Sequence, residues 1–178
     1  LWTTDGRLTR CLIDPQQAIP RVYECVVKGV VDFSWLEEQL RLGVQTRFEE
    51  DSYQGSLLSA RQYNPAEDSY AHAGCSEEDR RDDGPIQEMP PTGPHGVDST
   101  GLSIVQLRVQ EGKNRMVRRM LAHCGHPVIN LKRLRYGHFE LGSLASGEFR
   151  LAEAPEVEWA VSLLGAFRKR PLVACGDS

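Results

Sequence analysis

The stretch from Arg108 to Arg135 gathers side chains that can bind phosphate groups. It holds eight basic residues and one acidic residue, Glu111, so it is strongly positive although the whole chain carries a net charge of −4. Clustered arginines on a helix face, followed by a basic strand, are typical of a surface that binds a nucleic-acid backbone. The alternative is a solvated helix face, against which the lack of acidic residues at the i+4 positions argues. The basic residues are Arg108, Lys113, Arg115, Arg118, Arg119, Lys132, Arg133 and Arg135.

A second group, His123, Cys124 and His126, consists of residue types that can ligate zinc. These three residues lie around an expected helix end, and no partner pair follows at zinc-site spacing, so we expect no metal site. The five cysteines are scattered without a Cys-x-x-Cys pair, which argues against a disulfide framework and favours a reducing, intracellular compartment. Glycine-rich phosphate loops, Gly-x-Ser-x-Gly and dinucleotide fingerprints are also missing from the sequence.

An amphipathic helix over residues 113–124, ended by Gly125, must position most of the basic side chains. Its predicted apolar face carries Val117, Met120, Leu121 and Cys124, and another face carries Arg115, Arg118, Arg119 and Ala122. A strand over 102–109 precedes this helix, and a strand over 128–136 follows it after Pro127. We therefore expect the basic residues to lie where a helix joins a sheet.

The remaining elements alternate between strand and helix without regular βαβ spacing. A strand is predicted over 22–31, and a helix begins near Trp35 after Asp32 or Ser34 and ends at Gly43, with Leu36, Leu40 and Leu42 on its apolar stripe. Further strands are expected over 44–48 and 57–63, a short hairpin over 141–151, and a final helix over 156–166. This pattern favours an α+β fold with a mainly antiparallel sheet and flanking helices.

Residues 64–101 differ in composition from the rest of the chain. They hold five prolines and five glycines, and residues 64–98 carry nine acidic residues against Arg80 and Arg81. Such a segment cannot bury enough apolar surface to offset its ordering entropy, so we expect a mobile surface insertion that is dispensable for folding. With 178 residues, the chain then forms one domain, 1–178, interrupted by this insertion. The absence of an initiator Met suggests that it is an internal fragment of a longer protein.

Several motifs at fixed spacing resemble one family. Residues 111–121 read Glu-Gly-Lys-Asn-Arg-Met-Val-Arg-Arg-Met-Leu, residues 125–128 read Gly-His-Pro-Val, and residues 131–137 read Leu-Lys-Arg-Leu-Arg-Tyr-Gly. Upstream, residues 4–8 read Thr-Asp-Gly-Arg-Leu and residues 19–25 read Ile-Pro-Arg-Val-Tyr-Glu-Cys. Together these closely resemble the pseudouridine synthases that act on bacterial ribosomal RNA, a group that often carries an S4-like RNA-binding domain. The resemblance covers residues 1–63 and 101–153.

The resemblance implies an isomerase that converts uridine to pseudouridine in RNA without a cofactor. Such an enzyme needs an ionised carboxylate nucleophile, a proton-transfer group and a pocket for an extruded base. By resemblance, Arg118 lies against the nucleophilic Asp and keeps it anionic, while Tyr23 stacks on the base and moves a proton. The alternative for Tyr23 is an ordinary strand aromatic. The residues implied to hold phosphates and ribose are Lys113, Asn114, Arg115 and Arg119, with Lys132, Arg133 and Arg135 extending the RNA-binding surface.

The chain also departs from the family pattern. The nucleophilic Asp of the family aligns about eight residues upstream of Leu1, so we expect it outside this chain, and we interpret Asp5 beside Gly6 as a hairpin-turn residue. Met116 replaces the usual Gln, and Arg21 replaces the usual Lys. Met116 removes a polar group near the expected pocket, although Met tolerates irregular packing.

Two functions of different classes remain open at this stage. One is an RNA-modifying isomerase acting in rRNA processing and ribosome biogenesis. The other is a synthase-like fold retained as an RNA-binding or ribosome-assembly factor without catalysis. The expected partner of either is RNA, with ribosomal RNA or a pre-ribosomal particle favoured, and not a membrane. The acidic insertion suggests a eukaryotic, mitochondrial or plastid version, the alternative being a cytoplasmic protein.

Overall fold

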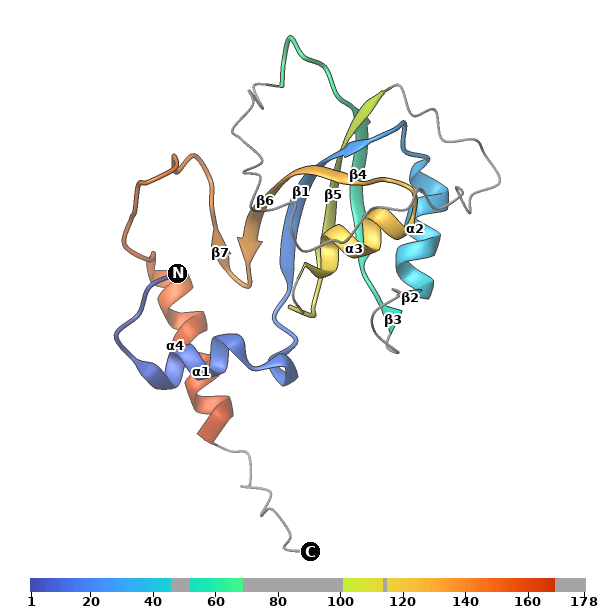
Figure 1. Ribbon diagram of the computed structural model, residues 1–178. Helices are drawn as coiled ribbons and strands as arrows, with labels where there is room; N and C mark the ends of the chain where they lie inside the picture. Colours follow the sequence, from blue (N-terminus) through green and yellow to red (C-terminus); the bar gives the residue numbers. More distant parts are fainter. Residues whose placement is uncertain (46–51, 69–100, 114, 169–178) are drawn as a thin grey trace, which may run out of the picture.

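The computed structural model describes residues 1–45, 52–68, 101–113 and 115–168. Its main sheet has five strands in the order β4-β5-β1-β6-β7, and all neighbouring strands are antiparallel (Figure 1). The strands are β1 (Arg21–Lys28), β4 (Ser56–Gln62), β5 (Leu102–Val109), β6 (Val128–Tyr136) and β7 (Phe139–Glu140). Two short strands, β2 (Val44–Gln45) and β3 (Ser52–Tyr53), pair separately. The α+β class with an antiparallel sheet is confirmed.

Two helices cover one face of the sheet and form the core with it. Helix α2 (Phe33–Leu42) contributes Leu36 and Leu40, and helix α3 (Met116–His123) contributes Met120 and Leu121, all fully buried. They pack on alternate residues of the central strands, namely Cys25, Val27, Val105, Leu107 and Val109. The strand predicted over 102–109 is confirmed with its alternating buried residues, whereas the strand predicted over 22–31 ends earlier, at Lys28, because the chain turns at Gly29 with φ of 86°.

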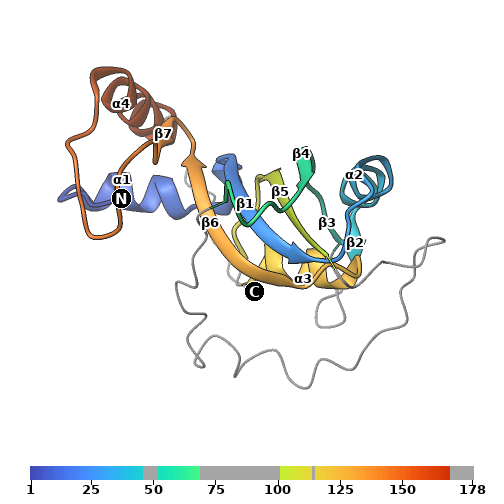
Figure 2. The same cartoon turned by 90° about the horizontal axis from the view of Figure 1, so that it is seen from above.

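The other two helices lie beyond the β7 edge of the sheet (Figure 2). Helix α1 (Gly6–Ile13) packs against helix α4 (Ala154–Arg168), and a single turn of 3-10 helix, η1 (Pro15–Gln17), leads from α1 towards β1. Trp159 of α4 stacks on His138 at 4.9 Å between ring centroids and contacts Phe139 edge-on, which fixes α4 against the β6–β7 turn. None of the helices in the described ranges has the length and apolar character needed to cross a bilayer.

The N-terminal prediction was wrong, because residues 6–13 form a helix. Asp5 is its N-cap rather than a hairpin-turn residue, since its carboxylate accepts a hydrogen bond from the Arg7 amide at 2.9 Å. The side chain of Arg7 also donates to this carboxylate, and these bonds lower the pKa of Asp5 to about 2.

Three other features differ from the prediction. Helix α3 begins at Met116 instead of Lys113, because Arg115 adopts a left-handed conformation with φ of 53°. Leu42 is 60% exposed and does not belong to the apolar stripe of α2. A hairpin over 141–151 does not form, since the chain already reverses at Gly137, where β6 pairs with β7.

The segment that begins the acidic insertion is structured over residues 64–68. Asp68 is 8% exposed and accepts two hydrogen bonds from the Arg61 guanidinium and one from the Asn64 amide. The hydroxyl of Tyr63 donates to the Asp68 carbonyl at 3.0 Å. Residues 69–100, which carry most of the predicted insertion, lie outside the described residues. The strand predicted over 44–48 is described only as far as Gln45.

Candidate functional site

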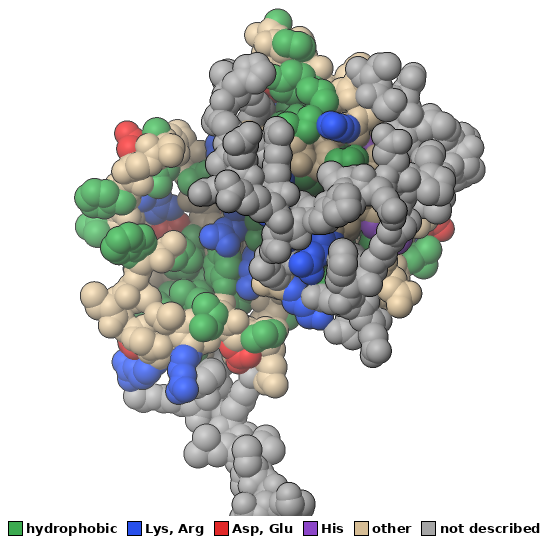
Figure 3. Space-filling view, viewed as in Figure 1, with side chains coloured by type: hydrophobic (Ala, Val, Ile, Leu, Met, Phe, Trp, Pro, Cys, Tyr) green, Lys and Arg blue, Asp and Glu red, His purple; other side chains and the backbone are tan. Residues whose placement is uncertain are grey.

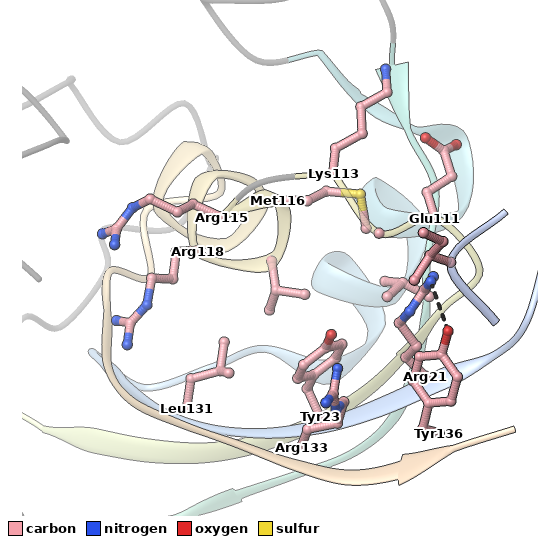
Figure 4. A pocket seen from close by; sticks show the side chains of 14 residues that line it. Arg21, Tyr23, Glu111, Lys113, Arg115, Met116, Arg118, Leu131, Arg133 and Tyr136 are labelled. Carbon is pink, nitrogen blue, oxygen red and sulfur yellow. Dashed lines mark hydrogen bonds between the residues drawn. The ribbon is translucent and has the colours of Figure 1, made fainter. Parts of the chain in front are cut away.

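A pocket of about 390 Å³ opens where α3 leaves the end of the sheet uncovered (Figure 4). Its walls come from the start of β1, the end of β6, the turn between β5 and α3, and the first residues of α3. Five basic side chains and one carboxylate, that of Glu111, line it. The lining residues are Ile13, Arg21, Tyr23, Val109, Glu111, Gly112, Lys113, Arg115, Met116, Val117, Arg118, Leu131, Arg133 and Tyr136.

Tyr23 lies between the two ends of the pocket (Figure 4). Arg115 and Arg118 lie at one end, and Arg21, Tyr136 and Glu111 lie at the other. Tyr23 occupies the face of β1 that also carries Cys25 and Val27, so its ring continues the apolar core to the pocket floor. Its neighbour Glu24 points to the opposite face and accepts a hydrogen bond from the Gln106 side chain at 2.8 Å.

A β-bulge shapes the β6 wall of the pocket. Tyr23 pairs with Arg133, but Val22 pairs with Arg135, so β6 has one extra residue, Leu134, at this point. Strict alternation would place Arg133 and Tyr136, three positions apart, on opposite faces. The bulge shifts the alternation by one residue and brings both side chains to the pocket.

The left-handed residue Arg115 determines how α3 meets the pocket. With φ of 53° and no side-chain cap, Arg115 turns the chain sharply into the helix. The side chains of both Arg115 and Met116 then line the pocket, although Met116 itself is buried against the core. Lys113 lies before this turn, with its ammonium 4.9 Å from the centre of the Tyr53 ring. The turn therefore places the basic side chains of Lys113 and Arg115 next to the apolar side chain of Met116.

Arg118, one turn further along α3, is half-buried and fixed. Its Nη1 atom donates to the Val128 carbonyl at 3.1 Å, at the start of β6. This bond uses one of the five donors of a guanidinium, and the group stays on the pocket wall. A carboxylate entering the pocket beside Arg118 would be stabilised in its charged form.

The structure brings together five of the site residues expected from sequence: Tyr23, Lys113, Arg115, Arg118 and Arg133. Three others, Arg119, Lys132 and Arg135, do not line the pocket, and Arg135 forms an ion pair with Glu140. Asn114 lies outside the described residues. On the face shown in Figure 3, Lys and Arg side chains gather near the middle, over the sheet and α3.

Sequence reasoning missed three contributions to the pocket. Tyr136 was part of a motif but had no expected role, Glu111 was counted only as the one acid in a basic stretch, and Arg21 was noted only as a departure from the family pattern. For Tyr136, the spacing of three from Arg133 on a strand gave no signal, because only the bulge places both on one face. Arg21 and Glu111 could have been found from the pairing of β1 with β5. Arg21 pairs with Val109, and Glu111 follows Val109 by two residues, so both lie at the same end of the sheet.

Two of the residues considered for metal binding, His126 and Cys124, are buried in the fold. The Nδ1 atom of His126 lies 3.1 Å from the Lys28 carbonyl, and burial lowers the pKa of this imidazole. Burial raises the pKa of the Cys124 thiol to about 12, so the thiolate that a metal requires is disfavoured. Across residues 1–45, 52–68, 101–113 and 115–168, no group of three or more His, Cys, Asp and Glu is placed to hold a metal ion.

The chain is similar in sequence to named RNA-modifying enzymes. It is 29% identical over 157 residues to the ribosomal large subunit pseudouridine synthase E of Xanthomonas campestris, covering 88% of this chain and 72% of that protein. It is 30% identical over 148 residues to the synthase E of Vibrio parahaemolyticus, covering 83% and 52%. A stretch of 56 residues is 46% identical to the ribosomal large subunit pseudouridine synthase B of Bacillus subtilis, covering 32% and 23%. No protein-family model matches the chain.

The fold is that of a solved pseudouridylate synthase. The two structures superpose with a TM-score of 0.60 at 19% sequence identity, covering 89% of this chain and 52% of the other. The chain spans about half the length of most of the curated relatives it matches. The sequence matches and the fold agree in making the RNA pseudouridine synthases the family that this chain is similar to.

Proposed function

We propose that the protein containing this chain isomerises uridine to pseudouridine in structured RNA, with ribosomal RNA of the large subunit as its substrate. The observation that carries the proposal is a single pocket in which Tyr23 lies between basic side chains that include Arg118 and Lys113. The names of the relatives support the choice of ribosomal RNA over transfer RNA.

The pocket suits an extruded nucleotide. An aromatic ring beside Val117 and Leu131 offers a flat apolar surface for a pyrimidine base. Guanidinium and ammonium groups around it can hold the flanking phosphates, which position RNA without reading its sequence. A base leaving its stack loses stacking energy, and these contacts offset that loss.

The reaction is redox-neutral, so we expect it to need no cofactor. The bond between N1 of the base and C1′ of the ribose breaks, the base rotates, and C5 forms a new bond to C1′. The C5 proton is lost, and N1 ends protonated. Tyr23 is proposed to exchange a proton with the rearranging nucleotide, and Arg118 to hold the nucleophilic carboxylate ionised.

The nucleophile is proposed to be an Asp that precedes Leu1 in the full-length protein. Among the described residues that line the pocket, Glu111 carries the one carboxylate, and Figure 4 shows it at the opposite end from Arg118. Asp5 caps α1, is bound by Arg7, and does not line the pocket. The reaction needs an ionised carboxylate nucleophile. An Asp that an upstream segment places beside Arg118 meets this need better than Glu111 or Asp5.

The proposal is tested by incubating the full-length protein with large-subunit ribosomal RNA that carries tritium at C5 of uridine. Release of tritium is expected, because C5 exchanges its hydrogen for the bond to ribose. Transfer RNA serves as the comparison substrate. Tight binding of ribosomal RNA without tritium release would contradict catalysis and support an RNA-binding or ribosome-assembly role. An rRNA substrate further implies that the protein works where ribosomes assemble, in a cytoplasm or an organelle.

A further inference from the structure

Arg21, the first residue of β1, is a buried cation. The residue is 8% exposed, and among the described residues it forms no ion pair. Burying a guanidinium is costly unless its donors are satisfied. Its partners are instead the Gln110 carbonyl and a single tyrosine, Tyr136, which contributes both its hydroxyl group and its aromatic ring.

Two hydrogen bonds join Arg21 to both sides of the pocket. Nη1 donates to the Gln110 carbonyl at 3.0 Å, in the turn between β5 and α3, and Nη2 donates to the Tyr136 hydroxyl at 3.4 Å. The Arg21 Cζ atom also lies 5.0 Å from the centre of the Tyr136 ring. The hydroxyl of Tyr136 donates in turn to the Leu12 carbonyl at the end of α1. One guanidinium therefore connects the turn, β6 and, through Tyr136, α1.

The backbone of Gly112 packs directly against the same guanidinium. A Cβ atom at position 112 would lie 2.8 Å from both Cζ and Nη2 of Arg21, and 3.0 Å from Nη1. Real side chains do not approach this closely, so a larger residue here would displace the guanidinium from its partners. Gly112 lies between Glu111 and Lys113, both of which line the pocket.

We infer that Arg21 is a positioning residue that fixes the turn Gln110–Lys113 and the Tyr136 ring, and that it acts on RNA through Lys113 rather than by contacting phosphate. This inference rests on the proposed RNA-binding function of the pocket. Arginine suits the role because its planar guanidinium can donate hydrogen bonds in two directions while one face of the plane packs on the Gly112 backbone. The ammonium of lysine is a compact charge on a flexible side chain and cannot do both.

A double-mutant cycle on thermal stability tests the packing without RNA. The variants of the full-length protein are Arg21→Gln, Gly112→Ala and both together. Each single change is expected to lower the midpoint, and the double variant should fall no further than Arg21→Gln, because the added methyl group then has nothing to displace. The control Gly6→Ala, where a Cβ meets nothing within 4 Å, should combine additively with Arg21→Gln. An unchanged midpoint for Gly112→Ala, or additive losses in the double variant, would overturn the inference.

Salt titrations of ribosomal RNA binding separate positioning from phosphate contact. Arg21→Gln should weaken binding by roughly three- to tenfold while the slope of log affinity against log salt stays that of the wild type. Lys113→Met, which removes a phosphate contact, should flatten that slope by about one. Arg21→Lys should resemble Arg21→Gln. A flattened slope in Arg21→Gln that Arg21→Lys restores would show that Arg21 itself binds phosphate.

The two tests distinguish failure of this inference from failure of the proposed function. If the wild-type protein binds no RNA, the proposed function fails, yet the stability cycle still reports whether Arg21 holds Gly112 and its turn. If the wild-type protein binds and modifies RNA but the cycle is additive, the function stands and the positioning role is wrong.

Discussion

Tyr23 on β1 lies opposite Arg133 on β6, whereas its neighbour Val22 lies opposite Arg135, so that Leu134 is an extra residue in β6. The Leu134 carbonyl accepts a hydrogen bond from the Leu141 amide at 2.8 Å, which anchors the bulge to the chain beyond β7. This relationship places an aromatic ring and a guanidinium next to each other at the pocket floor. A β-bulge in general increases the local twist of a sheet.

Replacing Tyr23 by Phe separates stacking from proton transfer. The ring remains, so RNA affinity should stay within about threefold of wild type, while the single-turnover rate should fall by roughly 10²-fold because the hydroxyl is lost. Filter binding and tritium release measure the two quantities. Tyr63→Phe is the control, since the hydroxyl of Tyr63 bonds to Asp68 outside the pocket. An unchanged rate in Tyr23→Phe would rule out proton transfer by the Tyr23 hydroxyl and leave the ring with stacking alone.

Removing Arg118 should abolish turnover with little loss of binding. Arg118→Ala deletes the cation proposed to keep the nucleophilic carboxylate ionised, so the pKa of that carboxylate rises and its position relaxes. Tritium release and RNA affinity are measured in the full-length protein, with Arg41→Ala on the exposed end of α2 as the control. Loss of binding in parallel with rate would identify Arg118 as a phosphate contact instead.

RNA binding should depend steeply on salt, because each phosphate neutralised by the pocket releases counterions. Replacing both Lys113 and Arg115 by Met should reduce the slope of log affinity against log salt by roughly one per lost contact, uniformly across RNA sequences. The Arg41→Met variant should keep the wild-type slope. A wild-type affinity that does not change with salt would show that the basic residues are only a solvated surface.

The ion pair between Asp68 and Arg61 should make stability depend on acid. Hydrogen bonds from Arg61, and then from the Asn64 amide, lower the pKa of Asp68 to about 2 from an ordinary value of 3.8. A depressed folded-state pKa stabilises the protein above about pH 4, and this stabilisation disappears as the pH falls from 4 towards 2. Asp68→Asn should therefore have a lower thermal midpoint than wild type at pH 6, with the difference closing towards pH 2. Glu67→Gln, at an exposed neighbouring position, should leave the midpoint unchanged.

Two glycines with nearly the same backbone conformation provide a matched test of how α4 docks. Gly137 and Gly142 have φ of 58° and 56°, so alanine at either costs roughly 1–2 kcal/mol of backbone strain. A Cβ at Gly137 would also clash with the Trp159 ring, whereas at Gly142 it meets nothing within 4 Å. Urea denaturation should show a loss of about 3 kcal/mol or more in the free energy of unfolding for Gly137→Ala and a smaller loss for Gly142→Ala. Equal losses would mean that Trp159 moves aside freely.

The sequence by itself determined the elements whose signals are local. Alternating apolar residues predicted the strand at 102–109, and β-branched and aromatic residues predicted the strand at 22–31. Asp32 or Ser34 as the cap, and the glycine at position 43, marked the ends of α2. The spacing of Val117, Met120, Leu121 and Cys124 correctly predicted the buried face of α3. The motifs around Lys113 and Arg118 indicated the family and most of the pocket-lining cations.

Only the tertiary structure decided which of these side chains meet. The bulge at Leu134 depends on how β1 and β6 pair, and no local pattern encodes such a pairing between strands about a hundred residues apart. The left-handed conformation of Arg115 overrides a helical pattern that extends back to Lys113, because the turn held at Gln110 and Gly112 by Arg21 constrains where the helix can begin. Asp5 reads as a turn residue in sequence and is a helix cap in the fold, since the packing of α1 against α4 stabilises a helix too short to form alone.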